Sequence, residues 1–131
     1  MIDIDRLKFI NDTYGHIAGD RVIRTVSRLL KQRLRKTDII GRYGGDEFVA
    51  ILIDADTSSA TTILNEIRES FSQIRYQTEE TEFSVTMSCG LATFPKYDNP
   101  EILHAVSDKA LLKAKAEGGN RIILAGERSL T

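Results

Sequence analysis

The sequence predicts an α+β domain in which helices cover a largely antiparallel sheet. Segments with helical apolar spacing and segments rich in strand-forming residues are mixed along the chain, in the order strand, helix, helix, hairpin, helix, strand, helix, strand. A tight glycine turn joins two of the strands, so that pair must be antiparallel. The length of 131 residues fits one domain, and no repeat or Pro/Gly-rich linker divides it.

The first five elements follow from local patterns. Apolar and acidic residues alternate over residues 1–5, as expected for a strand with one buried face. Residues 6–14 favour a short helix, and residues 19–35 carry a stripe of apolar residues typical of a long amphipathic helix. Residues 38–43 and 47–53 are predicted as the two strands of the hairpin.

The remaining four elements complete the order. Apolar residues recur at helical spacing in residues 58–74 and again in residues 101–117. Between them, residues 83–94 are rich in Val, Thr and Phe and are predicted as one strand. Residues 118–120, Gly-Gly-Asn, end the last helix, and residues 121–125 are predicted as a short final strand.

Composition excludes several classes of protein. Lys plus Arg (18) nearly equals Asp plus Glu (19), which argues against a nucleic-acid-binding protein because that class usually carries a basic excess. The longest apolar run, residues 48–53, is far too short to span a membrane. The single cysteine, Cys89, forms no disulfide within the chain, so a reducing, cytoplasmic location is predicted, with Cys89 as a small core residue.

Two groups of acidic residues are candidates for chemistry. Asp3 and Asp5 lie two residues apart on the first strand, so their side chains point to the same side. Asp46 and Glu47 lie at the tip of the hairpin. Carboxylates gathered in this way suit Mg²⁺ that also holds phosphates. The alternative to a metal site is that Gly-Gly-Asp is only a favourable turn sequence and that the acidic side chains are solvated. Two reasons would explain the two glycines before Asp46: a residue with a Cβ would obstruct the turn, or it would keep a ligand from approaching the backbone.

Three motifs together resemble one known family. Residues 44–48 read Gly-Gly-Asp-Glu-Phe, the signature of the GGDEF family of diguanylate cyclases. Residues 3–16 and the following Gly-Asp at 19–20 are similar to the family's first strand and loop, and residues 114–121 resemble its closing helix-to-strand motif. The resemblance implies a palm-like fold of the nucleotide-cyclase type. It also implies condensation of two GTP into cyclic di-GMP and two pyrophosphates, at the interface of a homodimer.

The resemblance also implies roles for the acidic residues. Asp3, the carbonyl of Ile4 and Asp46 match the family's ligands for Mg²⁺ or Mn²⁺. Glu47 matches the second acid of the catalytic edge, and either Glu47 or Asp46 would help to deprotonate the attacking 3′-hydroxyl.

Six further residues match the family's contacts to GTP: Lys8, Asn11, His16, Asp20, Gly45 and Lys115. Asn11 and Asp20 would read guanine, since an amide and a carboxylate can pair with its edge. His16 would lie in the same pocket, or it is an ordinary polar residue near a helix start. Lys8 and Lys115 would bind phosphate, although Lys115 could equally be a solvated helix residue.

Arg35 and Asp38 are spaced as in the family's inhibitory Arg-x-x-Asp site, six residues before the signature glycines. The resemblance implies that the product cyclic di-GMP binds there, because the guanidinium fork grips phosphate or guanine. Arg68, on the next predicted helix, is a weaker candidate to complete this site. The alternative is an Arg favoured at a helix end followed by an Asp that starts a turn.

Besides mild departures at Leu7 and Phe9, the sequence departs from the family pattern at two more consequential places. Gly119 stands where the family often has a basic residue that holds phosphate. The chain also begins near the end of the family's first strand, so we expect residues 1–131 to be a domain truncated at its amino-terminal end, with apolar sheet surface exposed. The family's sensory or membrane module is not visible in this sequence.

These departures leave three other functions open. An inactive domain could bind GTP or act as a receptor for cyclic di-GMP. A different nucleotidyl-transfer enzyme on a palm-like fold, such as an adenylate-using cyclase, would differ in the base that it reads. A scaffolding module would require all three motifs to be accidental.

Overall fold

The main sheet has five strands, in the spatial order β2-β3-β1-β6-β7. A computed structural model of the chain describes residues 1–126. The strands are β1 (Ile2–Ile4), β2 (Ile39–Arg42), β3 (Glu47–Ile51), β6 (Met87–Leu91) and β7 (Ile122–Leu124). Every neighbouring pair is antiparallel except β6 and β7, which are parallel. The predicted largely antiparallel sheet with flanking helices is therefore confirmed.

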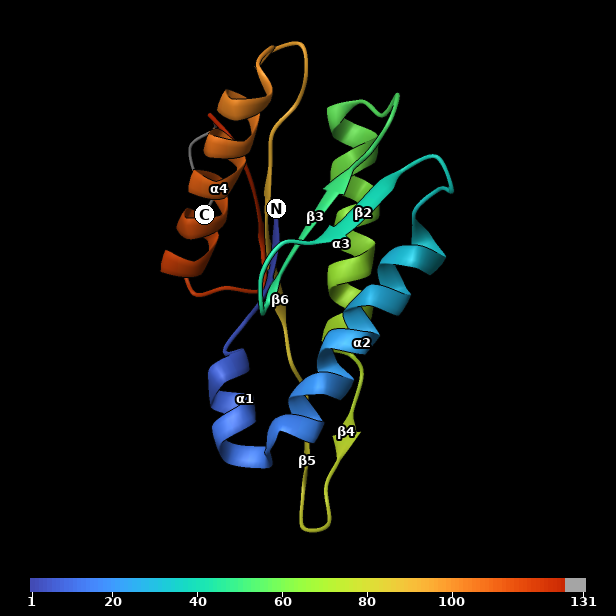
Figure 1. The fold of residues 1–131 in the computed structure, drawn as a ribbon, viewed down its shortest axis with the longest axis vertical. Helices are drawn as coiled ribbons and strands as arrows, with labels where there is room; N and C mark the ends of the chain where they lie inside the picture. The colour runs from blue at the N-terminus through green and yellow to red at the C-terminus, as the bar shows by residue number, and fades with distance from the viewer. Residues whose placement is uncertain (127–131) are drawn as a thin grey trace.

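Helices cover both faces of the sheet. They are α1 (Leu7–Tyr14), α2 (His16–Arg33), α3 (Thr57–Ser72) and α4 (Pro100–Ala116). Helix α4 packs on β6 and β7, whereas α3 contacts the sheet from the other side and α2 packs against α3 (Figure 1). None of the helices within residues 1–126 is both long and apolar enough to cross a lipid bilayer.

The alternation of β1 separates the core from the candidate site. Ile2 and Ile4 are 2% and 1% exposed and belong to the core formed with α2 and α3. Asp3, between them, points to the opposite face, toward Lys115 of α4. The apolar stripe predicted for the long helix is the one that α2 buries, with Val22, Val26 and Leu30 fully buried. A three-residue strand thus places an acidic side chain beside α4.

Two predicted elements differ from the observed ones, and the short strand at residues 76–77 was not predicted. The long helix begins at His16, three residues earlier than predicted, because the break after α1 is limited to Gly15, whose φ is +93°. Residues 83–94 form two strands rather than one: β5 (Glu82–Phe83) pairs with β4 (Tyr76–Gln77), and β6 starts only at Met87. The Phe83 ring stacks on both Tyr76 and Tyr14, which holds β5 in a separate ribbon.

Candidate active site

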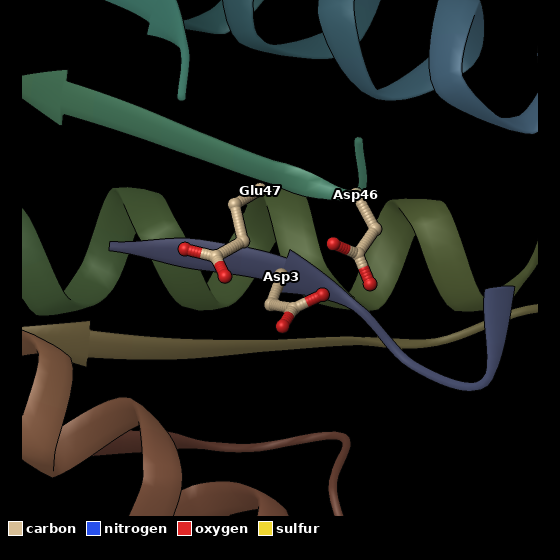
Figure 2. A group of neighbouring side chains, drawn as sticks. All are labelled: Asp3, Asp46 and Glu47. Carbon is tan, nitrogen blue, oxygen red and sulfur yellow. The ribbon is translucent and has the colours of Figure 1, made fainter. Parts of the chain in front are cut away.

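Three carboxylates from β1 and the hairpin meet beside the central strand of the sheet. Asp3 lies directly opposite Glu47 in the antiparallel register, so both side chains emerge on the same face. Asp46 is fixed beside them because the Ile4 amide donates a hydrogen bond of 3.0 Å to the Asp46 carbonyl. One oxygen from each of Asp3, Asp46 and Glu47 lies within 4.8 Å of the others, as Figure 2 illustrates.

The electrostatics of Asp3 suit a cation. Burial raises its pKa to about 7, Lys115 opposes that shift, and the nearby Asp46 and Glu47 add to it. Its Oδ1 atom is buried and accepts no hydrogen bond from the described residues. This carboxylate has a raised pKa and a buried oxygen that accepts no hydrogen bond from the described residues, and two more carboxylates lie next to it. Such an arrangement fits a divalent cation with oxygen ligands.

Asp5, two residues along the chain, has the opposite environment. Its carboxylate accepts hydrogen bonds from the Thr86 hydroxyl (2.7 Å), the Ser88 hydroxyl (2.8 Å) and the Asn120 amide (2.9 Å), and Lys115 Nζ lies 2.7 Å away. Burial alone would raise its pKa, but the hydrogen bonds from Lys115, Thr86, Ser88 and Asn120 lower it overall. Asp5 is therefore held ionised by the fold and ties the end of α4 to the sheet.

Lys115 of α4 lies beside Asp3 and Asp5. Besides Asp5, its ammonium donates to the Ile4 carbonyl at 3.2 Å and lies 3.5 Å from Asp3 Oδ1. The alternative that Lys115 is a plain solvated helix residue is therefore wrong.

The hairpin turn is held by Arg42, which sequence reasoning did not single out. Its guanidinium donates to the carbonyl oxygens of Gly44 (3.1 Å) and Gly45 (2.7 Å). Neither glycine is among the positive-φ glycines of residues 1–126, and an added Cβ would meet no atom closer than 4.0 Å. The prediction that a side chain would obstruct the turn is therefore wrong. The open space beside Gly45 leaves the other explanation, close approach of a ligand.

The predicted guanine-reading residues lie at the junction of α1 and α2. The Asn11 side chain packs against Gly19 so closely that a Cβ there would lie 1.8 Å from Asn11 Oδ1. Asp20, the residue after Gly19 in α2, is exposed. The contact between Asn11 and Gly19 therefore places Asn11 beside the part of α2 that carries Asp20. His16 is the exposed first residue of α2, and Lys8 is exposed on α1.

Arg35 and Asp38 contact each other, whereas Arg68 contacts a different part of the chain. Asp38 accepts hydrogen bonds from the amides of Arg35 (2.9 Å) and Ile53 (3.0 Å), and the Arg35 guanidinium, 58% exposed, contacts Asp38 and the Ile53 carbonyl. Arg68 instead donates to Asn120 Oδ1 at 2.7 Å.

Three residues of the site had no signal strong enough to single them out. Thr86, Ser88 and Asn120 hold Asp5, yet they lie 81 to 115 positions away from it along the chain. Thr86 and Ser88 alternate with buried apolar residues in the segment that leads into β6. That alternation was the available signal, since polar side chains in a buried strand require partners.

The fold and the acidic cluster together define a mixed α+β domain with three carboxylates gathered beside its central strand. The family described as "Diguanylate cyclase, GGDEF domain" matches residues 1–121, and the chain belongs to this family. The chain is 37% identical over 125 residues to Diguanylate cyclase A of Treponema denticola, covering 95% of this chain and 34% of that protein. It is 40% identical over 123 residues to the uncharacterised protein YhcK of Bacillus subtilis, covering 92% and 34%.

Solved structures of the same family have the same fold. The GGDEF domain of DgcB from Caulobacter crescentus, in complex with c-di-GMP, superposes with a TM-score of 0.90 at 32% identity, covering 96% of this chain and 73% of that one. The active GGEEF domain of a diguanylate cyclase from Vibrio cholerae gives 0.87 at 28%, covering 97% and 81%. The chain spans about a third of the length of the two curated relatives.

Proposed function

We propose that this chain condenses two GTP molecules into cyclic di-GMP and two pyrophosphates. The observation that carries the proposal is the meeting of Asp3, Asp46 and Glu47, whose ligand oxygens lie within 4.8 Å of one another in a domain of the diguanylate cyclase family. Asp3, Asp46 and the carbonyl of Ile4 would hold Mg²⁺ or Mn²⁺. A bound divalent cation would neutralise charge on the phosphates as the leaving group departs.

The chain's own groups position the reactants. Asn11 and Asp20 orient guanine, with His16 beside them, while Lys115 and Lys8 meet the phosphates, and the open backbone at Gly45 admits them. The 3′-oxygen of one GTP bonds to the α-phosphorus of the other as the bond from that phosphorus to pyrophosphate breaks. The hydroxyl proton passes to the Asp46–Glu47 pair. A second, identical step closes the ring, so positioning and electrostatics supply the catalysis.

The activity is tested by incubating the chain with GTP and Mg²⁺ and measuring cyclic di-GMP by mass spectrometry. Asp46→Asn should abolish the product because it removes a carboxylate of the cluster. Asp98→Asn, an exposed acid on the loop before α4, serves as the matched control and should leave the rate unchanged. A folded wild-type chain that yields no product would overturn the catalytic proposal for this chain.

We further propose that turnover requires two copies of the chain. One acidic cluster with one set of guanine-reading residues accommodates one GTP, so a second domain must present the other nucleotide face to face. The rate per chain should therefore rise with chain concentration until the dimer is saturated. A rate per chain independent of concentration, with light scattering showing a monomer throughout, would contradict this.

Product inhibition is proposed at Arg35 and Asp38, without Arg68. Asp38 is 3% exposed and fixes the loop through two backbone amides, while the Arg35 guanidinium projects from it and remains 58% exposed. Calorimetry with cyclic di-GMP should show loss of binding in Arg35→Ala. Arg33→Ala is the control, because Arg33 pairs with Glu66 of α3 at 2.5 Å. Equal affinity of wild type and Arg35→Ala would rule the site out.

A second candidate, a receptor that binds cyclic di-GMP without making it, is favoured by the exposed Arg35. It predicts calorimetric binding without product in the activity assay. An adenylate-using enzyme predicts ATP binding at least equal to GTP binding. Asn11 and Asp20 support guanine, and a direct comparison of the two nucleotides distinguishes the cases.

A further inference from the structure

Residues 118–120, in the connection from α4 to β7, form a turn in which φ is positive at every position. The angles are +114°, +75° and, at Asn120, +52°. The Asn120 amide donates to Asp5 Oδ2 at 2.9 Å. Its side-chain Oδ1 accepts a hydrogen bond of 2.7 Å from the Arg68 guanidinium, and its carbonyl accepts a longer one of 3.4 Å from the same nitrogen. The turn is therefore held between Asp5 of the acidic site and a residue of α3.

Arg68 is a largely buried cation to which the proposed function assigns no role. Its side chain is 15% exposed, and a guanidinium withdrawn from water needs partners for its donors. Its Nε donates to Asn65 Oδ1 at 2.9 Å, which holds the guanidinium against its own helix. From there Nη1 makes the contact with Asn120, 52 positions along the chain. Because α3 and α4 lie on opposite faces of the sheet, Arg68 links one helix layer to the end of the other (Figure 1).

The contacts continue from the turn to Lys115. Asp5, which accepts the hydrogen bond from the Asn120 amide, lies 2.7 Å from Lys115 Nζ. The turn also contacts the backbone of Lys115, since the Gly118 amide donates to the Lys115 carbonyl at 3.1 Å. The turn therefore fixes Lys115 in two ways, through its backbone and through the carboxylate that pairs with its ammonium.

A second arginine contact of α3 shows what a purely structural link would be. Arg33 of α2 pairs with Glu66 of α3 at 2.5 Å, with side chains 36% and 50% exposed. That pair joins α2 to α3, whereas Arg68 joins α3 to the turn that fixes Lys115. The two arginines therefore form a matched pair, in which only the contact of Arg68 leads to the acidic site.

We propose that Arg68 is a positioning residue for the phosphates of GTP. It acts through Asn120: their hydrogen bond fixes the turn, the turn fixes the end of α4, and Lys115 is thereby held where it meets phosphate. Arg68 acts through the protein and not by contact with the nucleotide. This inference rests on the phosphate contact proposed above for Lys115.

The test measures binding of 3′-deoxy-GTP with Mg²⁺ to the chain of 131 residues by calorimetry. This analogue lacks the hydroxyl that attacks in the proposed reaction, so turnover does not disturb the measurement. Arg68→Ala should weaken binding about fivefold, within the range of coupling between residues in contact. Arg68→Lys should recover most of the affinity, because lysine keeps a cationic donor for Asn120 Oδ1. Arg33→Ala is the matched control and should bind as wild type.

A variant of Asn120 tests the route of the effect. Asn120→Gly removes the Oδ1 acceptor, yet glycine adopts a φ of +52° readily and keeps the amide that donates to Asp5. It should weaken binding as much as Arg68→Ala, and the double variant should be no weaker than either, because both changes interrupt one contact. Additive losses would overturn the proposal, as would a loss in Arg68→Lys or in Arg33→Ala equal to that in Arg68→Ala.

Lys115→Ala separates this inference from the proposed function. It should weaken binding at least about tenfold, the loss expected for a charged hydrogen-bond partner. If Lys115→Ala binds as wild type, the phosphate contact and the role of Arg68 both fail. If Lys115→Ala weakens binding and Arg68→Ala does not, the inference about Arg68 alone is overturned.

Folding is checked for every variant by circular dichroism. A variant that is only destabilised contains fewer folded chains, which lowers the number of binding sites rather than the affinity of each site. Calorimetry measures the two quantities separately, so a structural role and a positioning role give different results. Asn120→Gly decides the question if Arg68→Ala does not fold.

Discussion

Asp3 and Asp5 lie two residues apart on the same face of one short segment, yet the fold treats them in opposite ways. Asp5 is surrounded by donors, and its pKa is lowered. Asp3 has a buried oxygen without a donor among the described residues, and its pKa is raised to about 7. The same residue type is thus a structural anchor in one place and an unsatisfied ligand in the other. The difference comes from which strand and helix lie alongside.

The comparison predicts the largest effect for loss of Asp5. Asp5→Ala removes the acceptor of Thr86, Ser88 and the Asn120 amide and leaves the Lys115 ammonium facing a partly buried gap. We expect unfolding to become easier by about 3 kcal/mol, the typical cost of breaking a buried pair. Asp3→Asn should cost less stability than Asp5→Ala, because the buried Oδ1 of Asp3 accepts no hydrogen bond from the described residues. Urea unfolding of both variants measures the difference, and equal losses would contradict the contrast.

The second prediction concerns cation binding, for which we expect Asp3 rather than Asp5 to matter more. Asp3→Asn should weaken Mn²⁺ binding about 100-fold or more, since even the partners of metal ligands contribute 10–100-fold. Electron paramagnetic resonance of free Mn²⁺ measures this directly, with or without catalysis. Glu69→Gln, an exposed acid on α3, is the control and should bind as wild type. An unchanged affinity in Asp3→Asn would remove Asp3 from the proposed cation site.

The sequence predicted the acids better than it predicted their surroundings. Asp3, Asp46 and Glu47 were found because the family motifs place them on the first strand and at the tip of the neighbouring hairpin. The hydrogen bonds of Asp5 to Thr86, Ser88 and Asn120 could not be found, since they depend on how β6 and the end of α4 approach β1.

The order of the elements was also predictable apart from the β4–β5 ribbon, and their limits were less so. The stripe of Val22, Val26 and Leu30 identified α2, since burying it requires a helix. The division of residues 83–94 was missed because it arises from stacking of the Phe83 ring on Tyr14 and Tyr76, a contact between segments far apart in the chain. Local propensity favoured one long strand, and tertiary packing ended it early.

The dependence of stability on pH should also differ between Asp3 and Asp5. The pKa of Asp3 is raised from 3.8 to about 7, so its contribution to stability is full below about pH 4 and is lost as the pH rises through 7. Asp5, with a lowered pKa, contributes above pH 3.8 and loses that contribution as the pH falls below it. Wild type should therefore lose stability relative to Asp3→Asn between pH 4 and pH 7. Thermal unfolding across this range tests the sign.

Cation binding should have the opposite dependence on pH. Protonated Asp3 is a poor ligand, so Mn²⁺ affinity should increase as the pH rises through about 7. Titration of Mn²⁺ at pH 6 and pH 8 provides the measurement, and Asp3→Asn should show a flatter profile. A wild-type affinity that does not change over this range would mean that Asp3 is already ionised at pH 6.

The smallest expected effect concerns Gly119, beside Asp5. Its φ is +75°, and an added Cβ would lie 3.0 Å from the Asp5 carboxylate, so any substitution there carries backbone strain. Gly119→Arg and Gly119→Ala share that strain, and their difference isolates the charge. We expect Gly119→Arg to bind GTP about fivefold more tightly than Gly119→Ala, the size of one partly exposed charge contact of ~1 kcal/mol. Calorimetry with GTP tests this, and equal affinities would mean that the Asp5 carboxylate, rather than phosphate, takes up the added guanidinium.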